Sequence, residues 1–156
     1  MNCQITSRLH PSHRDELEEL FFFHPQQSRF HTQILASIER FGSPEISQSA
    51  DGLKIRLPKL PESQILYALT EENNEEFLLG TMIFHRPDTR TLEILHIAVH
   101  PDLTHSTNGG NSPIVMLLVD ELCRIGRRVK GIESIRLMYG LGQIQIRDST
   151  TFDFSP

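Results

Sequence analysis

The stretch from Thr91 to Met138 constrains the fold more than any other part of the sequence. It begins with a mainly apolar run, Thr91 to His100, which predicts a strand covered on both faces. A loop with two adjacent glycines follows, and a long amphipathic helix then begins at Ser112-Pro113 and ends at Gly131. Residues Ile132 to Leu137 predict a second strand, parallel to the first if the crossover is right-handed.

A strand that leads through a loop into a helix N-terminus is a favourable place for an anion. Backbone N–H groups point outward there, and the helix dipole favours negative charge. The chain before this stretch predicts a strand, two helices and an antiparallel hairpin, over residues 3–9, 12–23, 28–41 and 64–85. Residues 43–63 are irregular and are either a solvated connection or a cover over a substrate site.

This order of elements predicts a single mixed α/β domain over residues 1–156, with a mostly antiparallel sheet and helices on both faces. The net charge of -5 argues against a general nucleic-acid partner, and no apolar run reaches the length of a membrane span. Two cysteines, Cys3 and Cys123, are too few for a disulfide framework. We therefore expect a cytoplasmic protein with no membrane partner.

Three histidines near this strand and its loop, His96, His100 and His105, raise the question of a metal site. On an extended strand His96 and His100 share a face but lie roughly 13 Å apart, whereas two ligands of one zinc ion must converge within a few ångströms. We therefore expect no metal site.

The residues Leu92-Glu-Ile-Leu-His-Ile-Ala-Val-His-Pro101, the glycine-containing loop and the helix after it resemble the central motif of the GNAT superfamily of acyl-CoA N-acyltransferases. The upstream order of elements, with Gly80 in the third strand, is similar to that family too, so the resemblance covers residues 3–138. It implies an acyl-CoA N-acyltransferase-like fold with acetyl-CoA or another acyl-CoA as co-substrate. The acyl group would pass to a primary amine, on a small molecule or a peptide, by direct attack.

The resemblance also implies roles for individual residues. Backbone groups of Ile97, Ala98 and Val99 would hold the pantetheine arm and the acyl carbonyl, and loop amides would hold the pyrophosphate, at Asn108, Gly109, Gly110, Asn111 and Ser112. Glu93 matches the general base of some branches, and burial among Leu95 and Ile97 would raise the pKa of its carboxyl group. The alternative for Glu93 is a structural carboxylate with no part in catalysis. His100 is a second candidate, as a base or a substrate contact.

Two departures from the family pattern define the alternative. The family has Arg or Gln, two spacers, Gly, one spacer and then Gly or Ala, and neither Gly109 nor Gly110 ends such a pattern here. Residues 139–156 form a reduced C-terminal segment, and Tyr139 cannot be matched to the family's proton-donating tyrosine. The second half of the substrate site is then missing, reduced or supplied by a homodimer partner. The alternative is therefore a catalytically degenerate GNAT-like binding or regulatory protein.

Overall fold

The computed structural model describes residues 2–22, 39–100, 113–137 and 143–145. The described strands are β1 (Cys3–Thr6), β2 (Glu45–Ser49), β3 (Gly52–Arg56), β4 (Gln64–Glu72), β5 (Glu75–His85), β6 (Thr91–Val99), β7 (Ser134–Leu137) and β8 (Gln143–Gln145). The helical elements are the 3-10 turn η1 (Pro11–His13), α1 (Arg14–Phe22) and α3 (Pro113–Arg128).

Six of the strands form one sheet in the order β1-β4-β5-β6-β7-β8, and β2 pairs with β3 in a separate two-stranded sheet. All neighbouring pairs are antiparallel except β6 and β7, which are parallel and are connected through α3. The predicted mixed α/β class and the mostly antiparallel sheet are therefore confirmed, and so is the parallel crossover.

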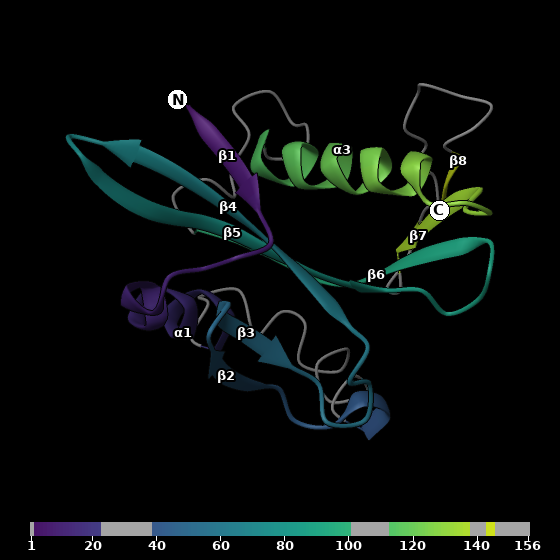
Figure 1. The fold of residues 1–156 in the computed structure, drawn as a ribbon, viewed down its shortest axis with the longest axis horizontal. Helices are drawn as coiled ribbons and strands as arrows, with labels where there is room; N and C mark the ends of the chain where they lie inside the picture. Colours follow the sequence, from purple (N-terminus) through teal and green to yellow (C-terminus); the bar gives the residue numbers. More distant parts are fainter. Residues whose placement is uncertain (1, 23–38, 101–112, 138–142, 146–156) are drawn as a thin grey trace.

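The large sheet has a hydrophobic core on each face. Helix α3 covers one face, and α1 with the β2–β3 hairpin lies on the other (Figure 1). Four residues of α3 at helical spacing, Ile114, Leu118, Val119 and Leu122, are fully buried in the first core. Gly131 follows α3 three residues after its last residue, Arg128. Its φ of 93° is a left-handed conformation that glycine adopts without strain. The expected helices on both faces are present.

The irregular segment contains the β2–β3 hairpin. In β3 buried residues alternate with exposed charged ones, whereas β2 is a mostly exposed strand that its polar sequence does not predict. Leu53 and Ile55 are buried in the second core, and the Tyr67 hydroxyl donates a hydrogen bond of 2.7 Å to the Leu53 carbonyl. β3 therefore packs on one face of the large sheet and is not a solvated connection. That this segment covers a substrate site stays a prediction.

The second predicted helix is described only at residues 39–41, which are helical, and Gly42 follows with a φ of 86°. The rest of that prediction, residues 28–38, lies outside the described residues, as does most of the C-terminal segment. Strand β8 belongs to this segment and pairs with β7.

Candidate functional site

Glu93 lies in a row of side chains that crosses three neighbouring strands. In the sheet register it stands opposite His85 at the end of β5 and opposite Arg136 on β7. Its Oε1 is 2.9 Å from Nε2 of His85, and its Oε2 accepts from Nε and a terminal N–H of Arg136, at 2.8 and 2.7 Å. Glu93 is only 3% exposed, so both carboxylate oxygens are engaged in the interior of the sheet.

The surroundings of Glu93 act on its pKa in opposite directions. Burial raises the pKa, but the hydrogen bonds from His85 and Arg136, with the charges of both partners, outweigh it and hold the pKa below its ordinary value. The expectation of a raised pKa is therefore wrong, because it considered burial without the two partners. At neutral pH, Glu93 is a charged and fully engaged carboxylate.

An ionised carboxylate only accepts hydrogen bonds, so His85 must carry its proton on Nε2. In the neutral ring, Nδ1 is then the nitrogen with a free lone pair. The ring of Phe41 packs edge-on against this imidazole, with 6.3 Å between the ring centroids, and His85 is 7% exposed. Arg136, Glu93 and His85 thus form a chain in which each member fixes the orientation of the next.

A β-bulge in β6 changes which residues face which core. The register steps from Ile83 opposite His96 to Phe84 opposite Ile94, which leaves Leu95 as an extra residue in β6. Ile97 therefore faces the α3 core together with Ile94, whereas Leu95 belongs to the opposite core. The expectation that Leu95 and Ile97 bury Glu93 together is therefore wrong for Ile97.

The described parallel pairing of β6 with β7 covers four residue pairs. It runs from Thr91 opposite Ser134 to Ile94 opposite Leu137, where the described part of β7 ends. β6 itself continues through Leu95–Val99, past the last residue pair of this described ladder. The backbone edge expected to receive an acyl carrier therefore lies beyond the described β6–β7 ladder.

The first turn of α3 lies close to this segment. A Cβ added at Gly80 would lie 3.0 Å from Cγ2 of Ile114 and 3.2 Å from the Ala98 carbonyl oxygen. Glycine at this position therefore lets α3 approach β5 beside the last residues of β6. His100 N–H donates to the Leu79 carbonyl at 2.7 Å and continues the pairing past the end of β6. The helix N-terminus and the end of β6 thus meet at one place on the sheet.

The predicted site residues fall into three groups. Ala98 and Val99 are buried and Ile97 is half-buried, all near the start of α3. His100 is exposed, seven residues beyond Glu93 and therefore roughly 20 Å from it at about 3.3 Å per residue. The structure does not bring these two catalytic candidates together. The predicted pyrophosphate residues, Asn108, Gly109, Gly110, Asn111 and Ser112, lie outside the described residues.

Sequence reasoning missed His85 and Arg136. His85 ends one predicted strand and Arg136 lies within another, so both were available as partners for a buried carboxylate. Their contact with Glu93 depends on the pairing register of β5, β6 and β7, which the bulge shifts by one residue. The available signal was chemical: a carboxylate inside an apolar strand needs compensating donors.

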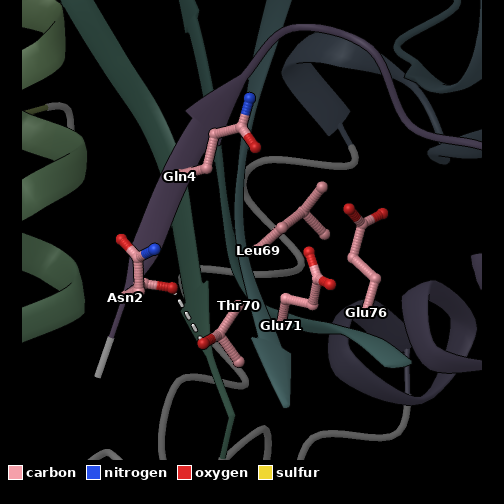
Figure 2. A pocket seen from close by; sticks show the side chains of 6 residues that line it. All are labelled: Asn2, Gln4, Leu69, Thr70, Glu71 and Glu76. Carbon is pink, nitrogen blue, oxygen red and sulfur yellow. Dashed lines mark hydrogen bonds between the residues drawn. The ribbon is translucent and has the colours of Figure 1, made fainter. Parts of the chain in front are cut away.

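A small hollow lies between β1, β4 and β5, away from this site. Figure 2 shows its mostly polar lining, which is formed by Asn2, Gln4, Leu69, Thr70, Glu71 and Glu76. Its volume is about 70 Å³. Pockets for drug-sized ligands have roughly 300–1,000 Å³, so this hollow does not suit a coenzyme.

Within residues 2–22, 39–100, 113–137 and 143–145, no three His, Cys, Asp or Glu side chains form a group that could hold a metal ion. None of the helices described in these ranges combines the length and apolarity needed to cross a membrane. Searches against protein-family models, curated proteins and solved structures find no match for this chain. The family assignment therefore stays a prediction that rests on the chain's own residues and geometry.

Proposed function

We propose that this protein is an N-acyltransferase that moves an acyl group from acyl-CoA to a primary amine. One observation carries the proposal: at Gly80 the first turn of α3 packs on β5 beside Ala98, so a helix N-terminus and the end of β6 meet at one place. An extended pantetheine arm can bind along a strand backbone, and a helix N-terminus favours the negative charge of a pyrophosphate. The acyl-CoA N-acyltransferase-like fold is part of the same proposal.

In the proposed reaction the amine nitrogen attacks the thioester carbonyl, the carbon–sulfur bond breaks, and coenzyme A leaves as its thiolate. Backbone groups at Ile97, Ala98 and Val99 would hold the carbonyl and the arm, and Asn108–Ser112 would hold the pyrophosphate. Both oxygens of Glu93 are engaged, so we assign the proton-accepting atom to Nδ1 of His85, which the proton reaches through water molecules because Ile97 lies four residues along β6 from Glu93. Glu93 and Arg136 then position His85. His100 lies roughly 20 Å from Glu93 and takes no part in this proton transfer.

Thermal unfolding with and without coenzyme A tests the binding half of the proposal. A ligand at 100 times its Kd stabilises the folded state by about 2.7 kcal/mol, which raises the melting temperature by several degrees in a domain of this size. Pantetheine and ADP serve as controls that separate the arm from the pyrophosphate. An unchanged melting temperature at millimolar coenzyme A would contradict the proposal.

A second candidate function is a GNAT-like protein that binds a ligand or a partner without catalysis. The saturated Glu93 carboxylate favours it, because a buried carboxylate with a lowered pKa and three donors is typical of a structural ion pair. Acyl transfer to a panel of primary amines separates the two functions. Coenzyme A binding without turnover by any amine, at any pH from 6 to 9, would support the second.

If transfer is detected, His85→Gln should lower kcat at saturating amine and remove the dependence of kcat on imidazole ionisation. The coenzyme A-induced shift in melting temperature should stay as in the wild type, because His85 does not touch the proposed carrier edge. An unchanged pH profile in this variant would remove His85 from the mechanism.

A further inference from the structure

His13 lies between two carboxylates on the face of the sheet that α1 covers. It ends the short η1 turn and is only 5% exposed. Its Nδ1 is 2.8 Å from Oε1 of Glu16 on α1, and its Nε2 is 3.0 Å from Oε1 of Glu76 on β5. Both ring nitrogens therefore face carboxylate oxygens from two different elements.

Ionised carboxylates accept hydrogen bonds and cannot donate them. Both contacts are hydrogen bonds only if His13 carries a proton on each nitrogen. A neutral ring keeps one of these protons, so one nitrogen would present a lone pair to a carboxylate oxygen.

Further negative charge lies next to this group. Glu71 on β4 stands directly opposite Glu76 in the sheet register, and Figure 2 shows both side chains lining the same hollow. Glu72 and Glu75 form the next pair toward the end of the hairpin. Like charges placed opposite each other destabilise a strand pair, and a cationic His13 beside Glu76 offsets part of that repulsion.

Glu16 connects His13 to the backbone of the sheet. Its second oxygen, Oε2, accepts the N–H of Leu78 at 2.8 Å. Leu78 precedes a β-bulge at Leu79, because the β4–β5 register steps from Gly80 to Leu78 there. The Leu79 carbonyl in turn accepts the N–H of His100 at 2.7 Å. The Glu16 carboxylate therefore holds the backbone next to the bulge, and the bulge residue Leu79 in turn holds the residue that follows β6.

We propose that His13 is a proton-operated clamp between α1 and β5. With two protons the ring holds Glu16 and Glu76 together, and Glu16 holds the Leu78 amide at the bulge. Loss of one proton breaks one of the two contacts, loosens the start of α1, and weakens the Leu78 hydrogen bond next to the end of β6. Histidine is the side chain that can gain or lose a proton near neutral pH, so its two states suit such a clamp. This device does not depend on the proposed acyl transfer.

Hydrogen exchange of the Leu78 amide, followed by NMR from pH 5.5 to pH 8.0, tests the clamp. After correction for intrinsic exchange, the wild type should lose about tenfold in protection at Leu78 across this range, which corresponds to one hydrogen bond. In Glu76→Gln the amide side chain donates to a neutral ring and accepts from a charged one, so protection at Leu78 should become independent of pH.

Glu75→Gln is the matched control, because it removes the same charge from the same strand without touching His13. It should keep the pH response of the wild type. The same pH response in the wild type, Glu75→Gln and Glu76→Gln would overturn the proposal. So would ¹⁵N chemical shifts that show a singly protonated His13 ring at pH 5.5.

Discussion

Two groups of histidine and glutamate, each with a buried histidine, lie on the same face of the sheet and satisfy their charges in opposite ways. In one, Glu93 has a cation beside it at every pH, because Arg136 does not lose its proton. In the other, Glu16 and Glu76 share only His13, whose charge depends on pH. Histidine and glutamate thus form a permanently charged group where an arginine also contacts the glutamate, and a pH-dependent one where histidine is the cation.

The largest expected effect comes from removing the permanent cation. Arg136→Met should lower the free energy of unfolding by about 2–4 kcal/mol, because Glu93 stays buried without its charge partner. This loss of stability is smaller than for a fully buried ion pair, because the arginine side chain is 47% exposed. Urea unfolding at pH 7 measures the loss.

Arg90→Met is the matched control for that variant. Arg90 pairs with Glu133 on the surface, where the two side chains are 70% and 47% exposed, and its removal should cost at most about 1 kcal/mol. Equal losses in the two variants would show that the Glu93 group is an ordinary surface pair.

Acid should expose the difference between the two groups next. The pKa of Glu93 is lowered in the folded protein, so its stabilising contribution is complete above the ordinary value of 4.5 and is lost as pH falls below it. Glu93→Gln should lower stability at pH 7 by about 1–3 kcal/mol and remove this acid-dependent part. Urea unfolding of both proteins at pH 7 and pH 3.5 measures it, and a gap that does not narrow at pH 3.5 argues against the ion pair.

The His13 group should respond with the opposite sign. The proposed clamp loses one of its two hydrogen bonds when His13 loses a proton, so stability should fall as pH rises from 6 to 8. Relative to His13→Gln, the wild type should lose about 0.5–1.5 kcal/mol of unfolding free energy, the net contribution of one hydrogen bond. His10→Gln, which changes an exposed histidine on the same segment, should follow the wild type. Parallel stability curves for the wild type and His13→Gln would remove the contrast between the two groups.

The smallest expected effect sets the baseline. Arg14 pairs with Glu18 one helical turn away at 3.1 Å, and both side chains are at least 40% exposed. Arg14→Ala should cost about 0.3–0.5 kcal/mol, with no change in slope between pH 5 and pH 8. A larger loss by urea unfolding would mean that charge near α1 matters through more than the His13 group.

Local pattern was enough to predict the elements of this fold. The apolar runs in β4, β5 and β6 and the spacing of buried residues in α3 are properties of single segments, so the sheet class and the crossover followed from them. Strand β2 was missed because four of its five residues are exposed and give no alternation.

The site was less predictable, because its chemistry depends on contacts between segments. The bulge at Leu95 redirects Ile97, and the partners of Glu93 come from strands whose register no local pattern fixes. The pKa of Glu93 therefore moved opposite to the expectation, since burial was visible in the sequence and the compensating donors were not. His13 was not singled out for the same reason.

Amide exchange along β6 with and without acetyl-CoA tests the central claim most directly. If Leu95–Val99 is the edge that holds an acyl carrier, saturating acetyl-CoA should increase protection at least about tenfold at one or more of the amides of Ile97, Ala98 and Val99. Amides in the middle of β4 should not change. Unchanged exchange across Ile97–Val99 at millimolar acetyl-CoA would contradict the proposed carrier site.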